Sequence, residues 1–197
     1  MSEVITDQAF ANEDWYAEEL ADRAYLRCSF DHVDLTEATS AGAVFEECTF
    51  GNVKFNASRH ADSAFLRCSF KRCNFFEAEF TGCKLVGSSF TQSAVRPMRI
   101  TGGDWSFVAL AGADLRGVTI KGTRMREVDL TAANCTDAVI VDTDLSGGQL
   151  HSARFGGCDL RGSDLTALEP TLVELRGAII TSTQAIVIAQ ALGLEIR

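Results

Sequence analysis

The sequence predicts a solenoid whose backbone turns a corner every five residues and which ends in a short C-terminal helix. Three observations support this prediction. Large apolar residues recur at every fifth position, small residues recur two positions before them, and both patterns stop near Ile180. A helix repeats every 3.6 residues and a strand every two, so neither element alone produces a five-residue stripe.

The five-residue stripe falls on the multiples of five. Of the 35 such positions from Phe10 to Ile180, 31 hold Leu, Ile, Val, Met, Phe, Tyr or Trp. Two residues before each stripe position, from Cys28 to Ala178, 29 of 31 positions hold Ala, Cys, Ser, Thr, Val or Gly. Polar and charged residues take most of the other three positions. Each set of five therefore contributes one large and one small inward residue, as one side of a solenoid would.

The rhythm changes after Ile180. Thr181 and Gln184 form a capping-box pattern, and Gly193 suits a helix C-terminus. We therefore divide the chain into a repeat domain at 1–180 and a capping and dimerisation segment, a helix and tail, at 181–197. A helix of about ten residues does not persist alone, so it should pack on the open end of the rod.

The repeat resembles the pentapeptide repeat family, whose pattern is A(D/N)LXX. The pattern appears as "AGADLRG" at 111–117, "CDLRGSDL" at 158–165 and "CNFFEAEF" at 73–80. The resemblance covers roughly residues 6 to 180 and implies an all-β fold, a right-handed quadrilateral parallel β-helix with four pentapeptides per coil. About 35 pentapeptides would make nearly nine coils, and thus a rod roughly 40 Å long at the usual strand spacing.

Several irregular positions have a structural and a functional interpretation. Cys28, Cys48 and Cys68 lie 20 residues apart in the small inward position, and we interpret them as core fillers rather than metal or redox ligands. Ser40 and His60 are also 20 apart; a polar pair satisfied inside the coil, or a local distortion, is favoured over a catalytic pair, which would need a partner and a cleft.

Two segments containing proline interrupt the pattern. The stripe stays in phase through "RPMRITGGDW" (96–105), which predicts a kink or a bulged side rather than an inserted loop. Pro170 occupies a stripe position in "LEPTL" (168–172), and we expect the regular coils to end there.

Composition limits the function. The net charge of −9 and the pI near 4.8 disfavour direct binding to nucleic acid or to an anionic membrane. Seven cysteines without a secretory signal predict a cytoplasmic protein. We find no Gly-rich phosphate loop, metal-ligand spacing or partnered nucleophile, so we expect no enzyme activity, cofactor, metal or small-molecule substrate.

Negative charge is concentrated near the C-terminal end. Residues 127–174 carry a net charge of −7, with two arginines against nine acids, the candidate partner-binding residues: Glu127, Asp129, Asp137, Asp142, Asp144, Asp159, Asp164, Glu169 and Glu174. Two copies joined at this end would present about one charge per 1.6 Å by strand spacing. Duplex DNA presents one per ~1.7 Å, so this rod could imitate DNA.

The join itself would use apolar side chains of the C-terminal helix and tail. An apolar surface that remains exposed on a monomer marks an interface. The candidate dimer-interface residues are Ile186, Ile188, Ala189, Leu192, Leu194 and Ile196.

The segments "VRPMRI" (95–100), "SRHADSAF" (58–65) and "TQAIVIAQALGLEI" (183–196) resemble the MfpA branch of the quinolone-resistance pentapeptide proteins, relatives of Qnr. That resemblance implies a C-terminal homodimer that binds DNA gyrase, a type II topoisomerase, imitates its DNA and confers resistance to topoisomerase poisons such as quinolones. The projecting loops of Qnr are absent, since no insertion breaks the register. The alternative is a structural or interaction scaffold of the same fold without a topoisomerase role.

Overall fold

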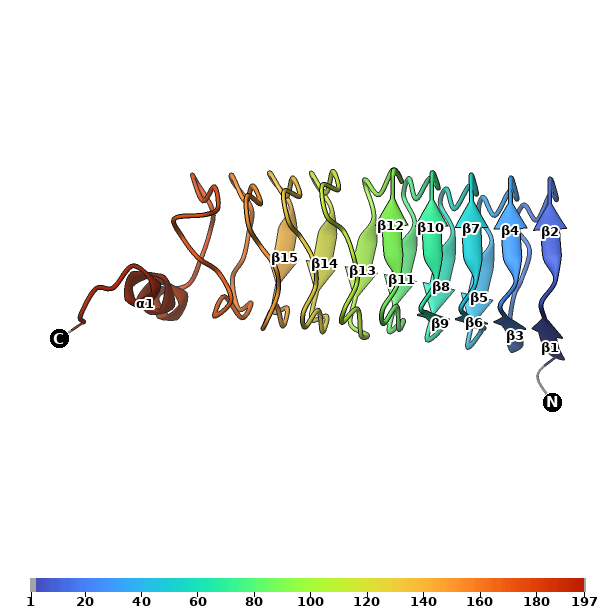
Figure 1. Cartoon of the computed structure of the whole chain (residues 1–197), viewed down its shortest axis with the longest axis horizontal. Helices are drawn as coiled ribbons and strands as arrows, with labels where there is room; N and C mark the ends of the chain where they lie inside the picture. Colours follow the sequence, from blue (N-terminus) through green and yellow to red (C-terminus); the bar gives the residue numbers. More distant parts are fainter. Residues whose placement is uncertain (1–2, 197) are drawn as a thin grey trace.

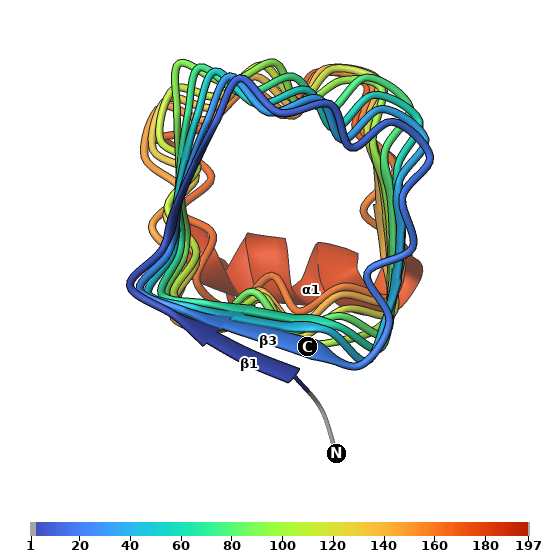
Figure 2. The same ribbon diagram turned by 90° about the vertical axis from the view of Figure 1, so that its right-hand side faces the viewer.

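The chain forms a square rod of stacked coils in a computed structural model that describes residues 3–196. The N-terminal coil lies at one end of the rod and helix α1 at the other (Figure 1), and an end-on view shows four sides (Figure 2). Every strand pair and isolated bridge is parallel and joins residues 20 apart, from Glu3 and Arg23 to Asp159 and Ile179. Four five-residue sides per coil are therefore confirmed.

We number the sides in chain order, with side 1 centred on Tyr25. Side 1 carries β1 (Glu3–Thr6), β3 (Arg23–Leu26), β6 (Val44–Glu46) and β9 (Ala64–Leu66). Side 2 carries β2 (Ala9–Ala11), β4 (Ser29–Asp31), β7 (Thr49–Gly51), β10 (Ser69–Lys71) and β12 (Ser89–Thr91). Side 4 carries β5 (Thr39–Ala41), β8 (Arg59–Ala61), β11 (Glu79–Thr81), β13 (Arg99–Thr101), β14 (Thr119–Lys121) and β15 (Val139–Val141). Side 3 is held by isolated bridges, such as that between Asp14 and Asp34.

The stripe residues fill the interior of the rod. Aromatic rings of successive coils stack: the centroids of Phe45 and Phe65 lie 4.7 Å apart at an interplanar angle of 5°, and those of Phe55 and Phe75 lie 4.7 Å apart at 7°. This separation equals the strand spacing, because each ring sits directly on its counterpart one coil away. No single coil buries its own apolar side chains, so the stability of each coil depends on its neighbours.

The corners explain the five-residue period. The residue two positions after a stripe residue commonly adopts the left-handed conformation, for example Asp7 with φ 55°, His32 with φ 55° and Gly42 with φ 68°. A single left-handed residue turns an extended chain sharply, and Asp, Asn and Gly tolerate it best. Gly103 is different: it occupies a small inward position with φ 80°, and a Cβ there would lie 2.0 Å from the Cys83 carbonyl oxygen.

The segment 96–105 contains no inserted loop, as predicted, and its irregularity is a shifted hydrogen bond at Pro97. The amide of Glu77 donates to the Pro97 oxygen, whereas regular corners donate to the residue 19 positions on, as Ala57 does to Phe76. The register is regular again at Arg99, which pairs with Glu79.

The expected end at Pro170 is wrong. Although the Ser152 amide also skips one residue to reach Leu172, the bridges continue to Ile179. Stripe amides donate to the next coil, as Phe155 does to Glu174. Pro170 lies in the last coil. No further coil follows to accept a hydrogen bond at this position, so the N–H that proline lacks is not needed there.

The two ends of the rod are closed differently. Helix α1 (Ser182–Ala191) has the predicted capping box at Thr181, and Gly193 follows its C-cap with φ 78°. At the N-terminal end no helix is found among the described residues. There the Trp15 ring packs edge-on against Phe10 and Phe30, at centroid distances of 5.1 and 5.7 Å, and covers the first coil.

Candidate partner-binding surface

The Ser40 and His60 pair is a satisfied core feature, as predicted. Ser40 Oγ lies 2.7 Å from His60 Nδ1, and His60 Nε2 lies 3.1 Å from Ser58 Oγ. Ser63 Oγ is 2.8 Å from Ser40 Oγ and donates to the Ala61 oxygen. Burial lowers the pKa of His60 to about 3, so its ring is neutral at physiological pH. No carboxylate contacts the imidazole in this network, and Ser40 and His60 are both buried.

The cysteines also occupy structural positions. All seven are unpaired and buried, and the Cys48 and Cys68 thiols donate to the oxygens of Tyr25 and Phe45 at 3.3 and 3.4 Å. Burial raises the pKa of Cys73 to about 11, which disfavours the thiolate. Within residues 3–196 no group of three or more His, Cys, Asp and Glu side chains could hold a metal ion.

The nine predicted acids lie on all four sides, so they surround the rod instead of forming one acidic side. We call this set the acidic girdle. By their positions in the repeat, side 1 carries Glu127, Asp144 and Asp164, side 2 Asp129 and Glu169, side 3 Asp137 and Glu174, and side 4 Asp142 and Asp159. All are exposed or half-buried.

Four of these acids also stabilise the turns. The carboxylates of Asp129, Asp144, Asp159 and Asp164 each accept the main-chain N–H of the residue two positions on, at 2.8–3.2 Å. Asn74 and Asn134 accept the same bond at 3.1 and 3.2 Å. This turn hydrogen bond therefore needs an Asp or Asn oxygen, as in other Asx-turns, but does not need a charge. Sequence counting missed this second role, although the D/N position of the repeat motif contains the signal.

Two girdle carboxylates have arginine partners. Asp144 lies 2.6 Å from Arg126, and Asp159 lies 2.6 Å from Arg161. The hydrogen bond from Arg161 lowers the pKa of Asp159; for Asp144 burial acts in the opposite direction, but Ser146 and Arg126 together lower the pKa. Both are therefore ionised at neutral pH. The other seven girdle acids form no ion pair with the described residues.

The predicted dimer residues fall into two groups. Ile186, Leu192, Leu194 and Ile196 are 45–59% exposed. Ile188 and Ala189 are half-buried, and Ile188 packs against the core of its own chain. Ile179 of the last coil, 48% exposed, adds to the same apolar end.

Gln184 fixes the helix to the rod, a role that sequence reasoning did not assign beyond the capping box. Its buried Nε2 donates to the main-chain oxygens of Leu160 and Ser163, at 2.7 and 2.8 Å. Its Oε1 accepts the Thr181 N–H at 2.8 Å. One side chain thus caps the helix and satisfies two carbonyls of the terminal coil.

The five-residue sides and square coils define a pentapeptide-type β-solenoid, and comparison with known families agrees. A profile described as "Pentapeptide repeat region" matches residues 43–125, and one described as "Pentapeptide repeats (8 copies)" matches 109–147 and 129–166. Together they span more than half of the sequence. The chain belongs to the pentapeptide repeat family.

A curated relative is the "Pentapeptide repeat protein MfpA" of Mycobacterium tuberculosis, 32% identical over 121 residues. The alignment covers 59% of this chain and 55% of that protein, so the chain spans about half the length of this relative. No helix within residues 3–196 has the length and apolar character needed to cross a bilayer.

Solved structures share the fold. Full-length QnrB1, described as a plasmid-mediated fluoroquinolone resistance protein, superposes with a TM-score of 0.60 at 17% identity, covering 97% of this chain and all of that one. A trypsin-treated QnrB1 variant gives 0.54 at 18% identity, covering 98% and 100%. Identities this low support the fold alone.

Proposed function

We propose that this protein is a homodimeric DNA mimic that binds DNA gyrase and thereby confers resistance to topoisomerase poisons such as quinolones. The proposal rests on the resemblance to the quinolone-resistance branch, the match to MfpA and the charge of the girdle. It acts by binding alone, in the cytoplasm, with no cofactor, small-molecule substrate, nucleic acid or membrane partner.

The girdle is the observation that carries the proposal. Its nine acids stand against Arg154 and Arg161, and a coil advances by about 4.8 Å, so the charge density approaches that of duplex DNA. The turn positions could have held Asn, as they do at Asn74 and Asn134. The four aspartates of the girdle therefore add negative charge that the fold does not need.

The distribution around the rod suits this function. Duplex DNA also carries phosphates around its whole axis, and a concave basic surface contacts more than one side of a rod lying in it. Dimerisation through Ile186, Leu192, Leu194 and Ile196 would place the two girdles on either side of the junction. The acidic centre of the dimer would then be about twice as long as that of one chain.

The test removes charge while keeping the turns. Asn retains the oxygen that accepts the turn hydrogen bond, so a quadruple variant with Asp129, Asp144, Asp159 and Asp164 replaced by Asn should fold normally. We expect its affinity for gyrase to fall at least about ten-fold, because close charge pairs at an interface contribute strongly. Gyrase binding and inhibition of DNA supercoiling, with and without a quinolone, would measure this.

A matched control exists in the other half of the rod. Asp14, Asp34, Asp104 and Asp114 make the same turn hydrogen bond, at 3.0–3.3 Å, outside the girdle. The corresponding four Asn replacements remove the same charge and should leave gyrase binding nearly unchanged. Equal losses in the two variants would refute a role for the girdle, and a parent protein that does not bind gyrase would favour the scaffold alternative.

A further inference from the structure

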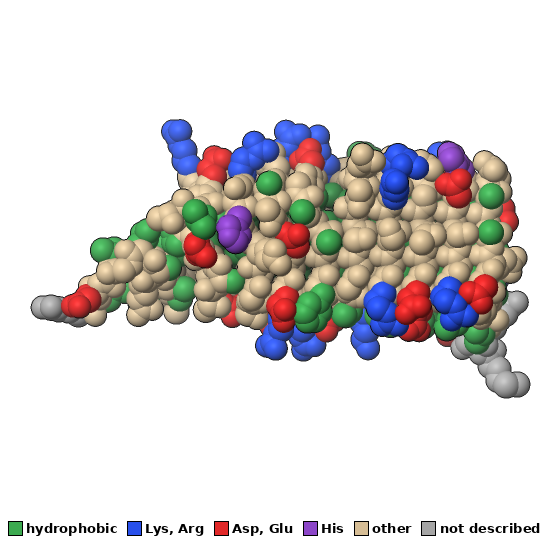
Figure 3. All heavy atoms as spheres, viewed as in Figure 1, with side chains coloured by type: hydrophobic (Ala, Val, Ile, Leu, Met, Phe, Trp, Pro, Cys, Tyr) green, Lys and Arg blue, Asp and Glu red, His purple; other side chains and the backbone are tan. Residues whose placement is uncertain are grey.

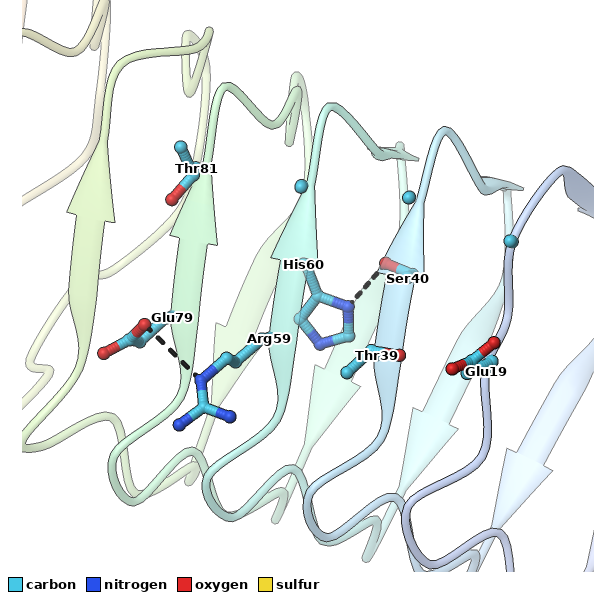
Figure 4. Close-up of a pocket in the computed structure, with 10 residues that line it drawn as sticks. Glu19, Thr39, Ser40, Arg59, His60, Glu79 and Thr81 are labelled. Atoms are coloured by element: carbon cyan, nitrogen blue, oxygen red, sulfur yellow. Dashed lines mark hydrogen bonds and ion pairs between the residues drawn. The ribbon is translucent and has the colours of Figure 1, made fainter.

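A groove runs along side 4 in the N-terminal half of the rod, away from the girdle. Its volume is about 560 Å³, and it crosses β5, β8 and β11. Ala21, Ala41 and Ala61 line it in successive coils, and we call this row its floor. Glu19, Arg59 and Glu79 line one wall (Figure 4). A site of this size is in the range of ordinary ligand and peptide pockets.

The floor is low because three successive coils place Ala at the same outward position. The equivalent position on side 1 holds Leu26 and Leu66, whose side chains are larger. Ser40 and His60, which are hydrogen-bonded to each other, also line the groove. The groove is therefore a preformed feature of the sheet and needs no movement of a loop.

Acids outnumber bases around the groove, although residues 23–126, which include Arg59, Asp62 and Glu79, carry a net charge of +4. Asp22 and Asp62 follow the floor residues at the corner, and Glu19 and Glu79 stand on the opposite wall. Two bases lie along the wall, and Arg59 and Arg99 each lie 3.8 Å from Glu79. Four carboxylates against two guanidiniums give a net charge of −2, and Glu19, Asp22 and Asp62 form no ion pair with the described residues.

Side 2 provides the contrast. Figure 3 shows this side in the foreground, largely uncharged, with charged side chains gathered along its edges. On side 2 no charged residue occurs between Arg72 and Asp129. The apolar floor with carboxylates on both borders is therefore a specific feature of side 4 in these coils.

We propose that this groove binds a segment of a partner protein that carries arginine or lysine. The carboxylates would pair with its cationic groups, and the alanine floor would contact the aliphatic stems of those side chains or the main chain. The negative charge of the groove disfavours a nucleic acid as the occupant. This inference does not depend on the proposed function, because it uses other coils and other residues.

The experiment uses the full chain and a short fluorescein-labelled peptide of alternating arginine and alanine. Fluorescence anisotropy would give its affinity at low and high salt. We expect Glu19→Gln and Asp62→Asn each to weaken binding about three-fold, as expected for partly screened ion pairs, and together about ten-fold. Ala41→Phe, which fills the floor without changing the charge, should abolish binding at the groove.

Controls on other sides separate the groove from general negative charge. Ala111 is exposed one position after a stripe residue, as Ala41 is, so Ala111→Phe is the matched steric control. Asp31→Asn on side 2 with Asp14→Asn on side 3, two exposed carboxylates outside both the groove and the girdle, is the matched charge control. Both should bind like the parent.

The proposal would be overturned by equal losses in the groove and control variants, by no loss in the Glu19→Gln and Asp62→Asn variant, or by no binding by the parent at low salt. The two charge variants keep the test valid even where Ala41→Phe does not fold. Spermine added as a competitor identifies the source of the cation. If spermine fully displaces the labelled peptide when the two are present at the same total positive charge, the groove binds polyamines, and the proposal of a protein partner is overturned.

Discussion

Replacing Ser40 with Leu and His60 with Phe should remove a pH-dependent loss of stability without damaging the core. On side 4 the flanking stripe positions hold Leu20 and Phe80, so the double variant completes an apolar column. His60 already stacks on Phe80, at a centroid distance of 4.8 Å. Ser58 and Ser63 donate to the main-chain oxygens of Phe55 and Ala61, and both bonds remain when the imidazole is removed.

The magnitude follows from the pKa of His60, which burial lowers from 6.5 to about 3. Between these values the unfolded chain binds a proton that the folded chain does not, so the free energy of unfolding decreases as the pH falls. The slope is about 1.36 kcal/mol per pH unit within that window. Between about pH 7 and about pH 5 the parent should therefore lose about 2 kcal/mol through His60, and the double variant should not.

Urea unfolding at these two pH values, followed by far-UV circular dichroism, measures the difference. Other titrating groups are common to both proteins, so their effects cancel in the comparison. His60→Gln, which keeps a polar side chain that does not titrate, is a second test of whether protonation of His60 causes the loss of stability. A parent and a double variant that lose the same free energy between these pH values would refute a neutral, buried His60.

Two further predictions concern the C-terminal end. Gln184→Ala leaves two carbonyls of the terminal coil without their donor and should reduce the free energy of unfolding by about 2–4 kcal/mol. The exposed Gln190→Ala in the same helix should change it by less than about 0.5 kcal/mol, and equal effects would argue against the anchor. Leu192→Asp should convert a dimer to a monomer in light scattering, because it places a charge in the apolar end. Val4→Asp, an exposed residue at the opposite end, should not, and an unchanged mass for Leu192→Asp would contradict the proposed interface.

The sequence was sufficient for the path of the backbone. The stripe predicted a corner at every fifth residue, the family resemblance implied the pairing of residues 20 apart, and Thr181 and Gln184 predicted the start of α1. The corner and the capping box each depend on a few neighbouring residues, so local patterns are enough to specify them. The prediction failed at Pro170, because the effect of a missing N–H depends on whether another coil follows.

The candidate surfaces were less predictable. Counting charges along the chain located the acidic segment near the C-terminal end but did not separate the four sides or show that Asp129 and Asp144 also cap turns. Nor did it reveal the groove, whose wall and border residues Glu19, Asp62 and Glu79 are separated by up to 60 positions in the sequence.

The sequence by itself thus determined which side chains point inward, because a corner at every fifth residue fixes the inward and outward positions within each set of five. The tertiary structure decided which outward side chains become neighbours, because stacking brings together residues one or more whole coils apart. The hydrogen bond from Gln184 to Leu160 and the groove over Ala41 both exist only once the coils are stacked.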